Sequence, residues 1–478
     1  MNFQMVRYIL GWVMNIEAAF MAVPCITALV YQERSGYAFL LVMLCSALAG
    51  FLLTRKKPHN TVIYAREGFV TVALSWIVMS FIGAMPFVIS GEIPRFVDAL
   101  FESVSGFTTT GASILADVEA LSRCTLIWRS FTHWIGGMGV LVFLLAVLPL
   151  AGGYYMYLMK AESPGPSVSK LVPKVKRTAM ILYGIYIGLT ILQIILMLLG
   201  DMPFFDALAT AFGTAGTGGF GIKNDSIGGY SAYIQNVITI FMILFGVNFN
   251  VYYLILAGKA RQAVKSQEVR GYFLIILAAV TVITLSVTDM YSSLWESMRH
   301  AAFQVGSIIT TTGFSTTNFD LWPQNCKTIL IILMFVGACA GSTGGGIKVS
   351  RLVILLKTVK KELAHFIHPR SIKKIKMDGH PIEHEVVRSV NVFLITYAVI
   401  FFGSVLLITV DNLSFTTNFT AVAATLNNIG PGLEMVGPTQ NFGLFSDFSK
   451  VVLMFDMLAG RLELFPMLLL LTPATWRR

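Results

Sequence analysis

Charged residues are scarce in this chain: Asp, Glu, Lys and Arg make up 13% of its 478 residues, whereas 55% are hydrophobic. A water-soluble globule needs more charge on its surface, so the composition excludes that class. Apolar runs long enough to cross a hydrocarbon core of roughly 30 Å recur along the chain instead. They predict membrane spans near residues 8–31, 37–53, 68–89, 125–150, 178–199, 232–257, 271–288, 327–340, 389–410 and 449–473.

Cysteine is also sparse, and the polar residues form no recognisable catalytic set. The five cysteines are Cys25, Cys45, Cys124, Cys326 and Cys339. They show no metal-ligand spacing, and an odd number argues against a disulfide framework, so we interpret them as small buried side chains. No nucleophile with its base, and no group of metal ligands, occurs at a functional spacing. The sequence therefore predicts neither an enzyme nor a bound cofactor.

The basic residues are unevenly distributed. Of the 35 Lys and Arg residues, 26 lie in the segments 1–7, 54–67, 160–177, 258–270, 348–388 and 476–478. Every second connection between spans has few. Cytoplasmic segments of membrane proteins carry this excess, so we predict that these segments and both termini are cytoplasmic. The net charge of +10 does not indicate a nucleic-acid partner, because no aromatic residues interleave with the basic clusters.

Four of the opposite connections share one pattern. Each has a moderately apolar segment too short to span, followed by a turn of hydroxyl and small residues that ends in glycine. The four glycines are Gly111, Gly219, Gly313 and Gly430. They are separated by 108, 94 and 117 residues, and this similar spacing indicates a repeated structural unit.

Each unit has the order span, half-membrane helix, extended loop, span. Lipid cannot satisfy irregular backbone, so the four loops are expected to line one aqueous path. A half-helix entering from outside directs its C-terminal end, with about half a negative charge, toward the membrane centre, which favours a cation. Glycine lets the loop backbone turn its carbonyl oxygens inward. No carboxylate lies in the four turns, which argues against a divalent ion.

The last three residues of each turn are the expected cation ligands, through backbone carbonyls and threonine hydroxyls. They are Thr109, Thr110 and Gly111; Thr217, Gly218 and Gly219; Thr311, Thr312 and Gly313; and Asn428, Ile429 and Gly430. One such turn alone is more often an ordinary surface turn. Four in the same register, each between spans, indicate a pore.

A glycine-rich stretch interrupts the second span of the third unit. It comprises Gly341, Ser342, Thr343, Gly344, Gly345 and Gly346. One interpretation is a plain helix end before a cytoplasmic helix at 349–366. However, the apolar run 328–340 is too short to cross the membrane by itself, so we expect the glycines to lie within it. Glycine has little preference for helix, and a flexible loop there can obstruct the path and move aside.

Three further polar residues lie within or near spans. Arg461 interrupts the last span. A charged side chain within a membrane span costs free energy, so an arginine there is first interpreted as functional. The plainer interpretation is a local ion pair with Glu463 or Asp456. Arg129, near the start of an outer-facing span, is expected to snorkel or to cap a loop. His133 is expected to be a packing histidine with satisfied hydrogen bonds.

Longer motifs add to this interpretation. They are LIWRS at 126–130 with WIGGMG at 134–139, GACAGSTGGGIK at 337–348, NNIGPG at 427–432 and MLAGRLE at 457–463. Together they resemble the Trk/Ktr/HKT superfamily of potassium transporters, and within it the TrkH-type membrane subunit, over essentially the whole chain. The resemblance implies an all-α polytopic membrane protein. Four pseudo-symmetric helix–pore-loop–helix repeats would surround one pore, beside two extra N-terminal transmembrane helices.

On this basis the extra helices are expected at 1–54 and the repeats at 55–160, 161–258, 259–366 and 367–478. The third repeat would contain an intramembrane gate loop at 341–346. The resemblance also implies that Arg461 faces the path, contacts the carbonyls of the gate loop and acts as an electrostatic barrier.

The family resemblance further implies potassium as the transported ion and a location in the bacterial inner membrane. It implies a homodimer in which each protomer has its own pore, joined to a separate cytosolic ring that binds nucleotide. Gly111 supports potassium, because plant relatives that favour sodium tend to have serine at this position. The second loop departs from the usual pattern, since Gly216 and Gly218 make it richer in glycine.

A cation-coupled secondary transporter is the alternative to a channel-like pathway. Such transporters usually show inverted repeats and ionisable residues at the membrane midplane. Here the repeats are parallel, and carboxylates are scarce in the spans. A membrane scaffold without transport leaves the four loops unexplained. The sequence therefore predicts potassium uptake through a channel-like filter, gated by the glycine-rich loop and by a cytosolic partner.

Overall fold

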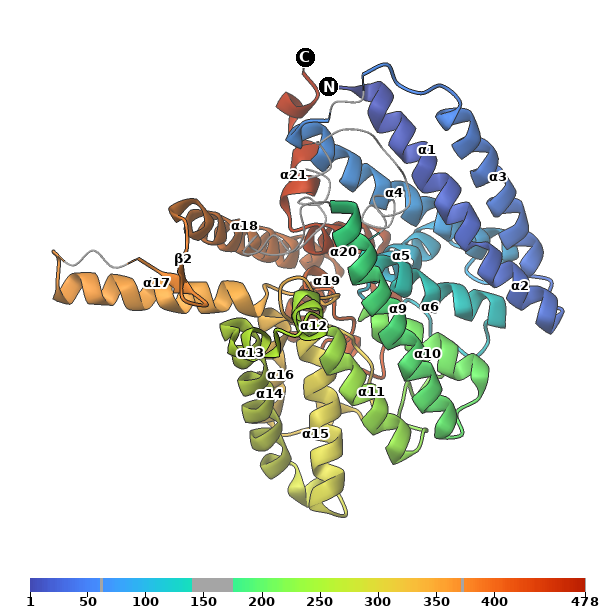
Figure 1. Cartoon of the computed structure of the whole chain (residues 1–478). Helices are drawn as coiled ribbons and strands as arrows, with labels where there is room; N and C mark the ends of the chain where they lie inside the picture. Colours follow the sequence, from blue (N-terminus) through green and yellow to red (C-terminus); the bar gives the residue numbers. More distant parts are fainter. Residues whose placement is uncertain (61–62, 140–174, 371–373, 478) are drawn as a thin grey trace.

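The computed structural model describes residues 1–60, 63–139, 175–370 and 374–477. Within these ranges the chain is almost entirely helical (Figure 1). Among the described residues, six helices are long and apolar enough to cross a membrane, or seven if one bent pair counts as a span. The prediction of an all-α polytopic membrane protein is confirmed. The end of the predicted span 125–150, the basic segment up to residue 174 and the repeat boundary at 160 lie outside the described residues.

The helices fall into five consecutive groups along the chain. The N-terminal group is α1 (Phe3–Phe20), α2 (Ala22–Tyr31) and α3 (Gly36–Thr54). The next groups are α4 (Ala65–Ser90), α5 (Phe96–Phe107) and α6 (Arg123–Met138), then α9 (Val175–Leu199), α10 (Phe204–Gly216), α11 (Ala232–Phe245), α12 (Phe249–Leu256) and α13 (Ala260–Lys265). The fourth group is α14 (Gln267–Ser286), α15 (Leu294–Ile309), α16 (Gln324–Val336) and α17 (Val349–Ile367). The last is α18 (His384–Ile408), α19 (Phe415–Leu426), α20 (Asp447–Arg461) and α21 (Phe465–Leu471).

The short helices α5, α10, α15 and α19 pack in a cyclic pattern. Each contacts the two spans of its own group. Each also contacts a helix of the preceding group: α5 packs on α20, α10 on α6, α15 on α11 and α19 on α16. This repetition surrounds one centre with four equivalent helix–loop–helix units, and most of the residues of the four short helices are buried.

Two of the predicted spans, 232–257 and 449–473, are each formed by two helices with a break between them. At 232–257 the chain bends by 90° between α11 and α12. Asn248 starts the second helix by accepting a hydrogen bond from the N–H of Asn250 at 2.9 Å, and the carbonyl of Gly246 accepts one from Cys339 at 3.0 Å. At 449–473 the helix ends at Arg461. It restarts as α21 with Pro466 in the first turn, where a missing N–H costs no hydrogen bond within the helix.

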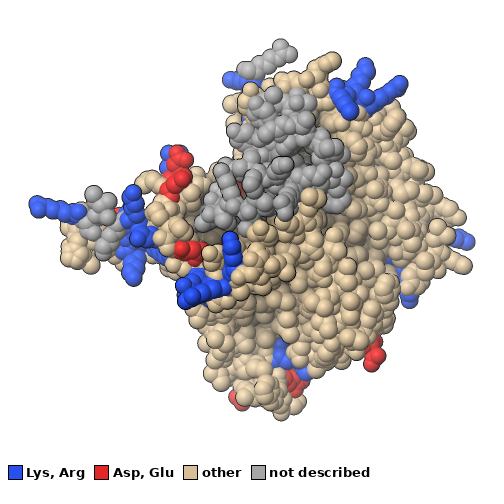
Figure 2. Space-filling model, in the orientation of Figure 1, with Lys and Arg blue, Asp and Glu red and all other residues tan. Residues whose placement is uncertain are grey.

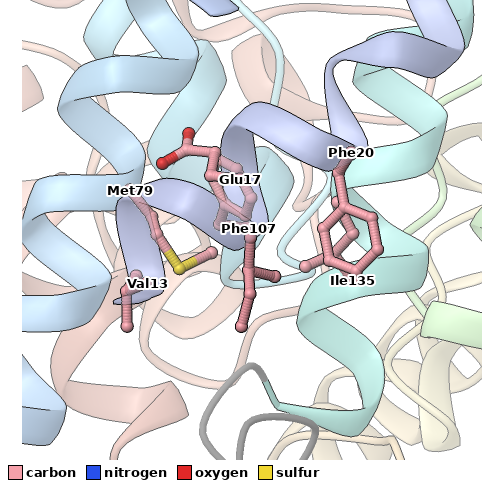
Figure 3. A pocket seen from close by; sticks show the side chains of 7 residues that line it. Val13, Glu17, Phe20, Met79, Phe107 and Ile135 are labelled. Atoms are coloured by element: carbon pink, nitrogen blue, oxygen red, sulfur yellow. The ribbon is translucent and has the colours of Figure 1, made fainter. Parts of the chain in front are cut away.

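The N-terminal helices lie against the back of the first repeat. Helix α1 packs on α3 and α4, and α2 packs on α6. A small pocket between α1, α4, α5 and α6 is lined by Val13, Ile16, Glu17, Phe20, Met79, Phe107 and Ile135 (Figure 3). The carboxyl group of Glu17 is buried there and has no hydrogen-bond partner among the described residues. The pocket borders the last residue of α5, Phe107, so α1 supports the end of that short helix from behind.

Helix α17 projects from the bundle as an arm (Figure 1). A two-stranded hairpin, β1 (Lys376–Met377) with β2 (His380–Pro381), folds back beside it with Lys376 opposite Pro381. Lys357 on the arm donates to the Lys376 carbonyl at 2.6 Å, and the N–H of Gln267 donates to Asp378 at 2.7 Å. Figure 2 shows Lys and Arg gathered on this arm and at the end that carries both termini, beside a broad uncharged surface.

Candidate functional site

The four short helices end in the same local structure. Just past each helix a backbone N–H donates to the carbonyl five residues earlier, at 2.8–2.9 Å: Thr110 to Ser105, Gly218 to Gly213, Thr312 to Ser307 and Ile429 to Ala424. The residue before each donor has a left-handed backbone: Thr109 (φ 55°), Thr217 (54°), Thr311 (58°) and Asn428 (55°). This is the Schellman helix end. Glycine usually occupies its left-handed position, and a β-branched residue there is strained by about 1–3 kcal/mol.

The four glycines that follow also have positive φ, between 76° and 99°. In each three-residue segment the first and third residues thus have positive φ and the middle residue does not. Alternation of this kind directs successive carbonyls toward one side of the chain, which is the requirement for a row of oxygen ligands. We call the segments 109–111, 217–219, 311–313 and 428–430 the filter loops.

The filter loops close into a ring. A Cβ atom at Gly111 would lie 1.9 Å from the carbonyl oxygen of Gly218, and one at Gly219 would lie 2.0 Å from that of Thr312. The ring continues: a Cβ at Gly313 would lie 2.1 Å from the Ile429 oxygen, and one at Gly430 would lie 2.8 Å from the Thr110 oxygen. Each glycine therefore packs against the residue that precedes the glycine of the next loop. No side chain fits between neighbouring loops at this level.

Several threonine hydroxyls of the filter loops are engaged behind or below the ring. Thr110 pairs with Thr108 at 2.8 Å, and Thr312 pairs with Thr310 at 2.7 Å. The Thr110 hydroxyl also accepts from Asn428 Nδ2 at 2.9 Å, which joins the first loop to the fourth. At these positions the hydroxyl braces the loop, and the backbone carbonyls remain the common element of all four loops.

Helix α6 forms a polar wall behind the first two filter loops. Arg129 does not snorkel, contrary to one expectation: it is 2% exposed and makes an ion pair of 2.6 Å with Glu102 of α5. Its Nη1 reaches the Gly221 carbonyl at 3.3 Å, so it does contact a loop. One turn further along α6, His133 is fully buried. Its Nδ1 lies 2.8 Å from the Gly106 carbonyl, and its Nε2 accepts the N–H of Phe220 at 3.3 Å.

The predicted gate loop 341–346 lies directly against filter loop 311–313 and the start of loop 428–430. The N–H of Gly345 donates to the Thr311 hydroxyl at 2.6 Å, and that of Gly346 donates to the Asn427 carbonyl at 3.1 Å. A Cβ at Gly344 would lie 2.8 Å from the Thr310 carbonyl oxygen. The loop thus packs against the helix-end side of these two loops and does not form a plain helix end.

The start of the gate loop is held by the break between α11 and α12. The N–H of Phe249 donates to the Gly341 carbonyl at 2.9 Å. Glu268, a buried carboxylate in the first turn of α14, accepts the N–H of Ala340 at 2.6 Å. The Asn248 amide lies 3.5 Å from the same carboxylate. The start of α12 and the first turn of α14 therefore both contact the beginning of the gate loop.

Arg461 contacts both the gate loop and the first repeat. Its Nη1 donates to the Thr343 carbonyl at 2.8 Å. Its Nη2 donates to the carbonyls of Gly136 and Gly137 at the C-terminal end of α6, the second at 2.9 Å. Of the two carboxylates considered as its partners, Glu463 pairs with Arg351, and Asp456 accepts the hydroxyl of Ser404 at 2.7 Å. Arg461 therefore links the gate loop to the C-terminal end of α6.

Comparison with known proteins now places the chain in a family. A family model described as a cation transport protein, TrkH, matches residues 37–477. The chain belongs to the TrkH family. Among its relatives, the Trk system potassium uptake protein TrkH of Escherichia coli (strain K12) is 36% identical, and that of Salmonella typhimurium is 35% identical, with 100% of both chains covered in each case. The Trk system potassium uptake protein TrkG of Escherichia coli is 33% identical over 99% of both chains.

A solved structure agrees with this assignment. The crystal structure of the potassium transporter TrkH from Vibrio parahaemolyticus superposes with a TM-score of 0.90, at 33% identity and with 100% of both chains covered. The TrkH family is one of transport proteins and not of enzymes.

Sequence reasoning missed parts of this TrkH-family site. The pair of Glu102 with Arg129 was not expected, although a carboxylate nine residues before a filter glycine, within an apolar half-helix, is a usable signal. Glu268 gave no signal of its own, since it stands at the polar start of a span. The side chain of Lys348, buried at the end of the gate loop, donates to the Gly344 carbonyl and was likewise not expected.

Proposed function

We propose that this chain takes up potassium through the ring of filter loops. The observation that carries the proposal is the closure of four neutral loops, each ending in a glycine with positive φ, into one ring. Backbone carbonyls are suited to replace the hydration shell of a monovalent cation. Relatives of similar length are named potassium uptake proteins, which supports potassium as the ion.

The proposed ligands are the carbonyl oxygens of the twelve filter-loop residues. They are Thr109, Thr110, Gly111, Thr217, Gly218, Gly219, Thr311, Thr312, Gly313, Asn428, Ile429 and Gly430. Potassium is the transported substrate, and the proposal requires no cofactor in this chain. The membrane potential supplies the driving force, about 2.3 kcal/mol per charge for each 100 mV.

The gate in this proposal is the loop 341–346 together with Arg461. Two features support it: the loop donates hydrogen bonds to the filter at Thr311 and Asn427, and Arg461 holds it through Thr343. In this position a potassium ion leaving the filter meets backbone and a guanidinium charge. The low dielectric of a pore screens that repulsion poorly. Conduction then requires the loop to move aside.

We propose the bacterial inner membrane as the location, with both termini in the cytoplasm. The Lys and Arg residues on the arm and near the termini support this orientation (Figure 2). We further propose a homodimer with one pore in each protomer. The projecting helix α17 supports it, because it exposes an apolar stripe at helical spacing that one copy leaves uncovered: Leu356, Val359, Leu363, Phe366 and Ile367.

A separate cytosolic ring that binds nucleotide is the proposed regulator. Helix α17 follows the gate loop without interruption, and its hairpin touches the start of α14, which holds the other end of that loop. A partner bound to the arm can therefore displace both ends of the loop together. Light scattering of the purified chain tests the dimer. Co-purification with a cytosolic nucleotide-binding protein tests the ring.

Uptake in cells tests the transport function. Cells that lack their own potassium uptake systems should grow at low external potassium when they express this chain. The variant Gly219→Asp, which places a carboxylate where no side chain fits, should not support growth at equal membrane expression. Failure of the wild-type chain to restore potassium accumulation, while it is present in the membrane, would contradict the proposal.

A further inference from the structure

One buried ion pair stands directly behind the filter. Arg129 and Glu102 are 2% and 0% exposed in their side chains, and within the described ranges no other ion pair has both partners this deeply buried. The pair is fully hydrogen-bonded on the carboxylate side. Glu102 receives Arg129 Nε at 2.8 Å, the Ser113 hydroxyl at 2.9 Å and the Ile114 N–H at 3.1 Å. A buried pair with this many partners has a well-defined geometry.

The two partners hold different filter loops. Glu102 binds Ser113 and Ile114, which continue the chain directly after the first filter glycine. Arg129 binds the carbonyl of Gly221, two residues after the second filter glycine. Its guanidinium carbon also lies 4.2 Å from the centre of the Phe220 ring. The ion pair therefore connects the outer ends of loops 109–111 and 217–219.

His133 completes this connection from the same face of α6. Its ring lies 4.3 Å from that of Phe220, on which Arg129 also packs. Because Nε2 accepts the Phe220 N–H, Nδ1 carries the proton and donates to the Gly106 carbonyl of α5. Phe220 is thus fixed through its ring and its backbone by two residues one helical turn apart.

The arrangement belongs to one side of the ring only. Nine residues before the filter glycine stands Glu102 in the first repeat, whereas the other repeats have Thr210, Gln304 and Ala421. Gln304 is fully buried, and neither of its amide atoms has a hydrogen-bond partner among the described residues. The charged connection therefore distinguishes the contact between loops one and two from the other three.

We propose that Glu102 and Arg129 are positioning residues that set the discrimination of the filter between potassium and sodium. Discrimination depends on the number and placement of carbonyls around the ion, and hence on how neighbouring loops are held. The ion pair fixes the distance between the outer ends of loops 109–111 and 217–219 without touching the ion. This proposal rests on the proposed potassium filter and adds the element that keeps it in register.

The test separates discrimination from folding. Removing one partner leaves a buried charge unpaired and endangers folding, whereas replacing both by apolar residues of similar volume is often neutral. The double variant Glu102→Met with Arg129→Met should therefore unfold near the wild-type temperature in detergent. In liposomes its ratio of potassium to sodium flux should fall about tenfold, while total flux stays measurable. A purely structural pair would leave the ratio of the folded double variant unchanged.

Matched variants complete the experiment. Gln304→Met changes the residue of the third repeat that is equivalent to Glu102, and this variant should keep the wild-type flux ratio. Arg129→Lys keeps the charge, but one ammonium cannot reach both Glu102 and Gly221, so its ratio should fall as well. This variant decides the question if the double variant does not fold. A flux ratio within about twofold of wild type in the folded variants overturns the proposal. A wild-type chain that itself fails to prefer potassium overturns the filter assignment instead.

Discussion

The guanidinium of Arg461 lies 2.8 Å from the carbonyl oxygen of Thr343 and also contacts the end of α6, 324 residues earlier in the chain. One side chain therefore connects the gate loop of the third repeat, the last long helix and the first repeat. The C-terminal carbonyls of α6 have no partners within their own helix, and a cation stabilises that end of the helix dipole. Arg461 donates to backbone carbonyls of both α6 and the gate loop, so it holds the two together.

Replacing Arg461 with alanine should raise the basal potassium flux. The change removes a charge-assisted hydrogen bond to the gate loop, a loss of about 1.5–3 kcal/mol, so the flux should rise about tenfold or more. Deleting two glycines from 341–346 should have a similar effect, and the combination should add little because both changes release one element. Flux assays in liposomes measure this. Wild-type basal flux in well-folded Arg461→Ala protein would refute the gate.

Gly111→Ser should relax the preference for potassium. The new Cβ would lie 1.9 Å from the Gly218 carbonyl oxygen, and the backbone has φ 77°, so the first two loops must shift apart. The ratio of potassium to sodium permeability should fall about tenfold. Gly91→Ser is the matched control, because Gly91 has nearly the same φ of 78° but nothing within 4 Å of its added Cβ. Equal permeability ratios in the two variants would show that crowding at the ring does not control selectivity.

Glu268→Gln should loosen the start of the gate loop. The carboxylate accepts the N–H of Ala340 at 2.6 Å, and the neutral amide makes a weaker bond of the same shape. The weaker hydrogen bond should stabilise the closed loop by about 1 kcal/mol less, so basal flux should increase several-fold. The control is Glu385→Gln, since Glu385 holds the same first-turn position in α18 but is exposed. An unchanged basal flux in Glu268→Gln would show that this contact does not hold the gate loop.

Asp98→Asn should destabilise the fold near the outer end of α5. Lys450, 1% exposed, makes an ion pair of 2.6 Å with Asp98, and the variant removes the carboxylate that its buried ammonium contacts. The expected loss is about 3 kcal/mol. Asp447→Asn breaks the exposed pair with Arg95 and should cost less than about 1 kcal/mol. Thermal unfolding in detergent compares the two; equal unfolding temperatures would contradict the assignment.

The repeat and the filter loops could be predicted from the sequence because their signals are local. A glycine that needs positive φ, such as Gly313, follows hydroxyl residues at a fixed distance, and the short apolar half-helix precedes it. The same local logic predicted the non-helical stretch 341–346, since four glycines follow an apolar run too short to cross a membrane by itself.

The remaining features depend on tertiary partners that hydropathy does not register. Arg129 was expected to snorkel or to cap a loop, and its ion pair was missed because its partner, Glu102, stands 27 residues away on another helix. The break after Phe245 was missed because 232–257 is apolar enough overall to cross a membrane, and the bend is held by a contact with Cys339 of another repeat. A single sequence reveals local dihedral requirements and spans, but not which buried polar groups pair across the bundle.

Ion flux through the purified chain tests the central claim most directly. The chain would be reconstituted in liposomes with an imposed membrane potential and no proton gradient, and potassium and sodium fluxes would be measured separately. The ring of four neutral filter loops predicts a potassium flux that follows the potential and exceeds the sodium flux. Equal fluxes of the two ions, or a potassium flux that appears only when a proton or sodium gradient is added, would contradict it.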